Sequence, residues 1–184
     1  MVSAYMSWSD GVDLVAFSAL GPSMPNVIVH CARMVHTPVG SAPAGMIFIP
    51  DETNPALPRA VGFVSPDPDV AAYFGPKVFA GTPFEHAPVL IGTVDVTLSL
   101  SQKRASVRVA IAGFIIESSL SGLGRLRSAD RPAGNLPFVE HAIEAKAATA
   151  EVIINGQPLT IILPPAGMSG GPAAVYSATG FYAR

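Results

Sequence analysis

The sequence predicts an all-β, antiparallel fold, either a barrel or a two-layer sandwich of about eight to ten strands, with at most one short helix. Two stretches alternate apolar and polar residues with the period of two that is typical of half-buried strands. Glycine (17 residues) and proline (18 residues) recur along the chain, which favours short strands joined by turns. The 184 residues contain no repeat or linker of domain length, so we expect a single β domain.

Residues 89–117 contain the clearest alternation and predict one long β-hairpin. Apolar residues stand at positions 94, 96, 98 and 100 of the first arm and at 107, 109 and 111 of the second. A polar turn at 101–104 would place Val96 opposite Val109 and Gly92 opposite Gly113. Paired glycines inside a ladder indicate a bend, as where a sheet curls into a barrel. We therefore expect a curled sheet that encloses an apolar cavity.

Turn residues divide the rest of the chain into shorter pieces. Residues 1–11 are expected to be a loose lead-in. Further strands are expected at 12–20, 26–35, 46–49, 59–64 and 173–182, loops at 37–45, 51–58 and 118–136, and a single helical turn at 69–74.

Residues 138–149 fit two interpretations. The alanine content and Pro137 at a first helical position favour a helix, whereas the alternation along 139–144 favours a strand. On the alanine content we expect the helix.

Residues 151–163 predict a second hairpin, because the Asn-Gly pair at 155–156 is the preferred two-residue turn, with positive φ at both positions. This turn places Val152 opposite Leu159. Pro158 has no N–H group to donate, so the return arm is expected at the edge of the sheet or at a bulge.

Composition and charge exclude several classes of partner. The net charge of −2, with no basic cluster, argues against nucleic acid or an anionic membrane. No apolar run approaches the roughly 20 residues that span a bilayer, and no positive charge leads the N-terminus as in a secretory signal. Cys31 is the only cysteine, so we expect a cytoplasmic protein without an internal disulfide. Because 49% of the residues are hydrophobic and only 13% are charged, we also expect homo-oligomers.

Two similar phrases, each with a glutamate followed by a histidine, supply the candidate catalytic residues: Glu85, His86, Glu140 and His141. A carboxylate beside apolar residues has a raised pKa when it is buried, and paired with an imidazole it could serve in general acid–base catalysis. The alternative is an ordinary solvated face. The chain has no H-x-H, H-E-x-x-H or C-x-x-C spacing, so we expect no metal site and no cofactor.

Basic residues supply the candidates for ligand binding, and we select Lys77, Arg125 and Arg127. Lys77 is one of three lysines and lies among apolar residues, where a desolvated lysine could form a Schiff base. Arg125 and Arg127, with Arg131 of the same expected loop at 118–136, could bind an anion such as a carboxylate or phosphate, although we favour a solvated loop.

Short motifs resemble the acetoacetate decarboxylase family. They are Pro76-Lys77, the strand start Leu90–Asp95 and the strand end Ile161–Pro164, and the resemblance extends over about half of the chain. The chain is short for that family. Ile115 and Ile116 occupy the place where the pattern would put the nucleophilic lysine, so the resemblance implies no activity here.

Three functions are compatible with these patterns. The first is a module that binds a small apolar or amphipathic molecule inside the barrel. The second is a small lyase or isomerase that uses a Glu/His pair in the same cavity. The third is a structural, self-assembling protein whose apolar surface is an interface between copies.

Overall fold

Alternating apolar and polar residues form thirteen strands in the part of the chain that the structure describes, together with one helix. A computed structural model describes residues 4–18, 24–51, 58–133, 137–168 and 170–183. The elements are β1 (Ala4–Ser18), β2 (Val27–Thr37), β3 (Gly40–Pro50), β4 (Pro58–Ser65), α1 (Pro68–Val78), β5 (Val89–Ser99), β6 (Arg104–Ile111), β7 (Phe114–Ser121), β8 (Arg127–Pro132), β9 (Val139–Lys146), β10 (Thr149–Ile154), β11 (Gln157–Leu159), β12 (Ile161–Ile162) and β13 (Ala174–Ala183). The all-β prediction with one short helix is confirmed, with more strands than the eight to ten expected.

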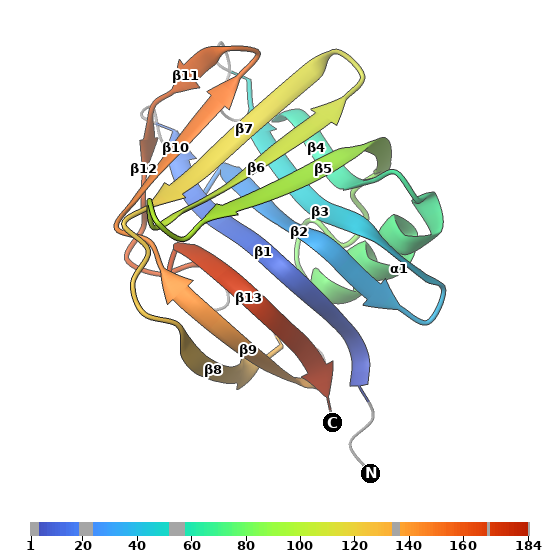
Figure 1. Ribbon diagram of the computed structural model, residues 1–184. Coiled ribbons are helices and arrows are strands. Elements are labelled where there is room, and N and C mark those ends of the chain that lie inside the picture. Colours follow the sequence, from blue (N-terminus) through green and yellow to red (C-terminus); the bar gives the residue numbers. More distant parts are fainter. Residues whose placement is uncertain (1–3, 19–23, 52–57, 134–136, 169, 184) are drawn as a thin grey trace.

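The strands form one continuous path in the order β11-β10-β7-β6-β5-β4-β3-β2-β1-β13-β9-β8, and β12 pairs with β1 beside it (Figure 1). Neighbouring strands are antiparallel except β4 and β5, which are parallel and connected through α1. A parallel pair needs such a crossover connection, which the helix supplies. Because the path ends at β11 and β8, the described sheet is open and does not close into a barrel.

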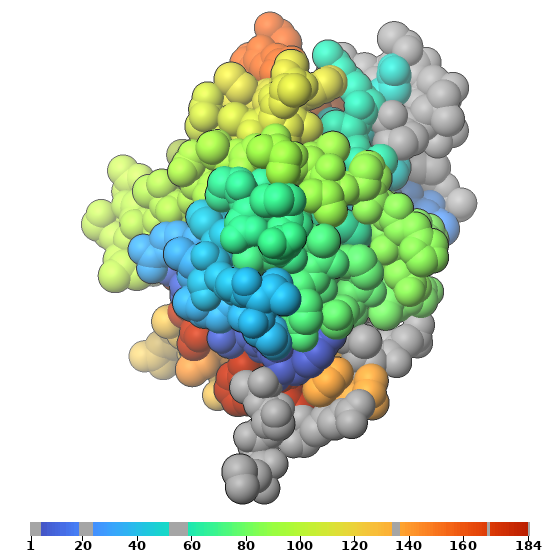
Figure 2. Space-filling view, turned by 90° about the vertical axis from the view of Figure 1, so that its right-hand side faces the viewer, coloured from blue at the N-terminus to red at the C-terminus, as the bar shows by residue number. Residues whose placement is uncertain are grey.

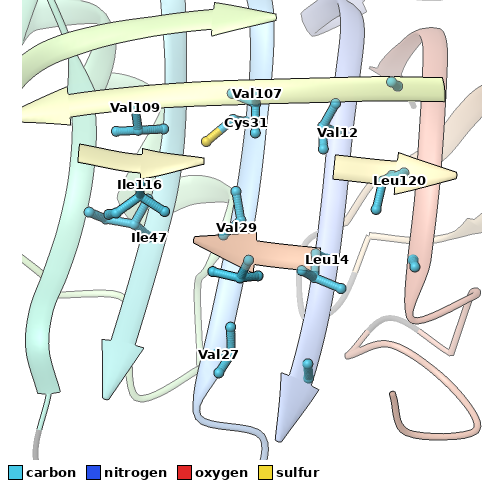
Figure 3. Close-up of a cluster of buried hydrophobic side chains, with 14 of the residues drawn as sticks. Val12, Leu14, Val27, Val29, Cys31, Ile47, Val107, Val109, Ile116 and Leu120 are labelled. Atoms are coloured by element: carbon cyan, nitrogen blue, oxygen red, sulfur yellow. The ribbon is translucent and has the colours of Figure 1, made fainter. Parts of the chain in front are cut away.

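The sheet folds back on itself, so that β5, β6, β7 and β10 run across β1, β2 and β3 (Figures 1 and 3). Apolar side chains from both layers meet between them, and Leu14 and Val29 have no exposed surface. They belong to one cluster with residues of the opposite layer such as Val109, Ile116 and Leu120 (Figure 3). The space between the layers, where the sequence predicted an apolar cavity, therefore holds the main hydrophobic core.

The other face of β1 to β4 carries α1. Asp67 caps the helix, because its side chain accepts hydrogen bonds from the N–H groups of Asp69 (3.0 Å) and Val70 (3.3 Å). Phe74 is buried against the sheet in a second apolar cluster. In the space-filling view α1 lies at the centre of this side, next to the light-blue turn between β2 and β3 (Figure 2). Among the described residues, no helix has the length and apolar character to cross a membrane.

Several predicted boundaries are wrong because strand pairing continues through segments rich in small or polar residues. The segment at 1–11 is not a loose lead-in, since β1 begins at Ala4 and pairs with β2 and β13; residues 1–3 lie outside the described part. Gly40 already starts β3, inside the expected loop at 37–45. The expected loop at 118–136 contains the end of β7 and all of β8, and the expected helical turn at 69–74 extends to an eleven-residue helix. The expected loop at 51–58 falls mostly outside the described residues.

The segment at 89–117 is a three-stranded meander rather than a single hairpin. The structure pairs Val96 with Val107, two residues away from the predicted Val109. The faces are nevertheless correct, because a shift by two residues keeps every side chain on its side of the sheet. Gly113 lies in the turn between β6 and β7 with φ +79°, and Gly92 pairs with Ile111, so the predicted glycine pair does not form.

Residues 139–146 form β9, so the helix expected at 138–149 is wrong. Alanine favours a helix, but β9 gains partners on both sides, β13 and β8, and pairing of this kind overrides a weak local preference. The second predicted hairpin is confirmed. Asn155 and Gly156 have φ values of +49° and +78°, Val152 pairs with Leu159, and Pro158 lies on the edge strand β11.

Candidate functional site

A cavity of about 170 Å³ lies on the helix-bearing face of the sheet. Its walls come from β1, β2, β8, β9 and β13, from the end of α1 with the residues that follow it, and from the segment at 167–173. Apolar side chains form most of the wall, including Val15, Ile28, Phe79 and Val175. Six polar or charged side chains also line it: Asp13, His30, Thr82, Arg131, Glu140 and Tyr182. The Thr82 hydroxyl donates to the carbonyl oxygen of Phe79 (2.7 Å).

Asp13 and His30 form a hydrogen-bonded pair in this wall. They are direct partners in the ladder between β1 and β2, and Asp13 Oδ1 bonds to His30 Nδ1. The strand period of two puts Val12 and Leu14 in the main core and turns Asp13 to the cavity. His30 Nε2 makes no hydrogen bond to any described residue. The arrangement fixes one ring nitrogen and leaves the other available to a ligand.

Two aromatic rings hold the imidazole of His30 in place. Phe74 of α1 stacks on it with ring centroids 6.0 Å apart, and Phe79 meets it edge-on at 5.6 Å. A side chain held by packing and by a hydrogen bond keeps a defined orientation, which a binding or catalytic group requires.

The pKa of His30 is raised above its ordinary value of 6.5. Burial lowers the pKa, but the negative charge of Asp13 and the hydrogen bond to it act in the opposite direction and prevail. Glu140 raises the pKa further and Arg131 lowers it. The imidazolium form of His30 therefore persists to a higher pH than in an exposed histidine.

Arg131 lies near enough to His30 to lower its pKa, and it binds two carboxylates in the cavity wall. Its Nε and Nη2 donate to the two oxygens of Glu140 at 3.0 and 3.1 Å, and Nη2 also donates to Glu144. All three side chains are largely buried, with 16%, 12% and 7% exposure respectively. Burial raises the pKa of Glu144 more than Arg131 lowers it, so this carboxyl stays protonated to a higher pH than an exposed glutamate.

The remaining guanidinium nitrogen of Arg131 lies against the segment at 167–173. A Cβ atom on Gly171 would lie only 2.7 Å from Arg131 Nη1, so a larger residue there would require the guanidinium group to shift. Nη1 makes no hydrogen bond to a described residue. Arg131 and Gly171 both line the cavity. The two N–H groups of Arg131 Nη1 are therefore available to a ligand.

Tyr182 of β13 completes the polar end. It pairs with Glu140 in the ladder with β9, and its ring packs on Trp8 with centroids 5.2 Å apart. Burial and, after it, the negative charges of Glu140 and Asp13 raise the pKa of Tyr182, so the hydroxyl stays protonated. The hydroxyl makes no hydrogen bond to a residue within the described ranges.

No family model matches this chain, and the curated proteins and solved structures compared with it show no significant match. The resemblance of short motifs to the acetoacetate decarboxylase family therefore has no further support. The function of the cavity is therefore inferred from the residues that line it.

Of the four candidate catalytic residues, only Glu140 lines the cavity. His141 follows it directly in β9 and so projects to the opposite face, where it bonds to Asp130 (2.7 Å) and stacks on Phe181 (5.0 Å). Glu85 accepts a hydrogen bond from the N–H group of Gly81 (2.8 Å) in the segment after α1.

His86 is exposed. The structure thus separates Glu140 from the histidine that follows it and pairs neither glutamate with its neighbour.

The three candidate ligand-binding residues lie outside the cavity wall. The ammonium group of Lys77 packs on the rings of Tyr73 (3.8 Å to the centroid) and Tyr5 (5.9 Å). Arg125 and Arg127 are exposed. Within the described ranges, no group of three or more His, Cys, Asp or Glu side chains is arranged to hold a metal ion.

The sequence analysis missed Asp13, His30 and Tyr182. A signal was present, because Asp13 and His30 each interrupt an otherwise apolar strand, Val-Asp-Leu-Val and Val-Ile-Val-His-Cys. A charged group on a strand that is buried on both faces needs a partner, which the neighbouring strand supplies.

Proposed function

We propose that the protein binds a small amphipathic molecule in the cavity on the helix-bearing face of the sheet. The observation that carries this proposal is the convergence of polar side chains from five strands on one end of an otherwise apolar cavity. Ligand sites commonly combine apolar walls with a few polar groups that orient the ligand. The location differs from the sequence-based expectation, which placed the ligand between the two layers of the sheet.

The volume sets the size of the ligand. An apolar cavity of about 150 Å³ accommodates benzene, and the cavity here is about 170 Å³. A ligand of one ring, or of a short branched chain with one polar group, fits this space. Long-chain lipids do not fit inside it.

A set of small amphipathic compounds tests the proposal by ligand-observed NMR. Compounds of this size should bind the unaltered protein and the Val39→Phe control, in which an exposed turn residue is enlarged. They should not bind Val15→Phe, because the added ring occupies the cavity. Equal binding to Val15→Phe, or no binding to the unaltered protein, would refute the proposal.

Catalysis of proton transfer, as in a small lyase or isomerase, is a second candidate function. The Asp13–His30 pair favours it, because the carboxylate orients the imidazole and leaves Nε2 free to take up or release a proton. The raised pKa of His30 widens the pH range over which the imidazolium form is available to act as an acid.

Exchange of carbon-bound hydrogen for deuterium in small carbonyl compounds measures this activity. We expect His30→Gln to reduce the exchange rate at least about 100-fold, the typical contribution of a general base. His36→Gln on the same strand is the matched control, because His36 is exposed and bonds only to Ser41 among the described residues. Equal rates in both variants would exclude His30 as the base. Self-assembly remains a prediction that native mass spectrometry checks.

A further inference from the structure

We infer that the cavity takes a small monocarboxylate, whose carboxylate accepts hydrogen bonds from Arg131, His30 and Tyr182 and whose apolar part lies against the remaining walls. This inference rests on the function proposed above, since it names the class of molecule that the same cavity binds. The new element is the ligand's carboxylate, a charged acceptor group held by Arg131, His30 and Tyr182.

The free polar atoms at this end are mainly donors. His30 Nε2, Arg131 Nη1 and the Tyr182 hydroxyl have no hydrogen-bond partner among the described residues, and all three side chains line the cavity. Arg131 binds both oxygens of Glu140 and His30 binds one oxygen of Asp13, which leaves Asp13 Oδ2 as the carboxylate oxygen of the cavity wall without a partner among the described residues. Three free donors beside one free carboxylate oxygen favour a ligand that supplies acceptors over an ammonium group.

Two positive charges and two negative charges line the cavity. Arg131 and protonated His30 carry the positive charges, and Asp13 and Glu140 carry the negative charges. These four lining groups sum to zero, so one carboxylate brings a single negative charge, whereas a dicarboxylate brings two. Glu144, behind Arg131, has a pKa that burial raises. The helix α1 adds only apolar and aromatic side chains to the surroundings of His30.

Charge-assisted hydrogen bonds to a carboxylate are about twice as strong as neutral ones. The guanidinium and imidazolium groups would supply such bonds to a monocarboxylate, and the tyrosine hydroxyl would add a third. The affinity for the carboxylate should therefore fall as pH rises through the titration of His30, because the imidazolium charge is lost.

Calorimetric titration with benzoate and benzamide tests the inference, since the two probes share a ring and differ in charge. At about pH 6, where His30 is protonated, the unaltered protein should bind benzoate at least about tenfold more tightly than benzamide. The preference should shrink at about pH 9, and Val15→Phe should bind neither probe. Benzamide binding as tight as benzoate would overturn the inference and leave the proposed function standing. Binding of neither probe would count against both.

Tyr182→Phe removes one donor and keeps the ring on Trp8. We expect this variant to lose about tenfold in affinity for benzoate and much less for benzamide. Tyr176→Phe is the matched control on the same strand, because the Tyr176 hydroxyl donates to Asp10 outside the cavity. An equal loss in the two variants would contradict the assignment. Should Tyr182→Phe fail to fold, as judged from its melting temperature, His30→Gln provides the same comparison.

Discussion

Asp13 and His30 lie directly opposite each other on β1 and β2, and the Asp13 carboxylate bonds to Nδ1 of the His30 ring. The pair occupies the face of the sheet that α1 covers, while the residues on either side of Asp13 belong to the main core on the other face. The β1–β2 pair thus contributes side chains both to the main core and to the cavity on the other face. The hydrogen bond fixes the ring, whose second nitrogen has no partner among the described residues, and the His30 side chain lines the cavity.

Asp13→Asn should lower the pKa of His30. The substitution removes the negative charge that raises the pKa, while the burial that lowers it stays. NMR titration of the histidine ring signals measures the change, with exposed His36 as the internal reference. An unchanged pKa would show that Asp13 does not govern the protonation of His30.

Much of the fold follows from local patterns. The period of two assigned the faces of β5 and β6, and the Asn-Gly pair located the β10–β11 turn, because only a few residue types adopt positive φ at both positions. The alternation could not detect a two-residue shift of register. The shift arises in the turn, where Lys103 adopts a φ of +48° that the sequence does not signal.

The candidate site was harder to predict from the sequence than the fold. Asp13, His30, Arg131 and Tyr182 come from four strands, and only the order of strands in the sheet brings them together. Nothing in their spacing indicates that β13 lies between β1 and β9. Glu140 was predicted because the segments around Glu85-His86 and Glu140-His141 are similar. The expected helix gave no indication that Glu140 and His141 lie on opposite faces of a strand.

The stability of the protein should fall as pH rises through the neutral range. The pKa of His30 is raised above 6.5 and that of Glu144 above 4.5, so the folded protein holds more protons than the unfolded chain. The contribution of His30 is fully present below pH 6.5 and is lost as pH rises through its raised folded-state pKa. Urea unfolding from about pH 5 to about pH 9 should show this loss in the unaltered protein and not in His30→Gln. If the free energies of unfolding of the unaltered protein and His30→Gln differ by the same amount at every pH in that range, the prediction is contradicted.

Arg131→Leu should lower the free energy of unfolding by about 3–5 kcal/mol, because it leaves Glu140 and Glu144 buried without their partner. Arg127 on the same strand is exposed, so Arg127→Leu should change the free energy of unfolding by about 0.5 kcal/mol or less. Adding Glu140→Gln and Glu144→Gln to Arg131→Leu should recover part of the loss. Urea unfolding at neutral pH compares the three variants with the unaltered protein, and similar losses in the two single variants would show that this cluster does not stabilise the fold.

Gly75→Ala should destabilise the contact between α1 and β4. A Cβ atom there would lie 2.3 Å from the ring of Phe63, and overpacking of a tight core contact costs about 1–3 kcal/mol. Phe63→Ala removes the ring together with its Cγ and so removes the clash, and the double variant should therefore lose less stability than the sum of the single variants. Strictly additive losses in thermal unfolding would mean that the two residues do not interact.

The most direct measurement follows the side-chain NMR signals of all four histidines while benzoate is added. The account predicts that the His30 signals shift and saturate, because His30 alone among them lines the cavity, while those of His36, His86 and His141 stay in place. In Val15→Phe the His30 shift should disappear. If His30 does not respond, or if the surface histidines respond equally, the cavity is not the site at which the protein binds a small carboxylate.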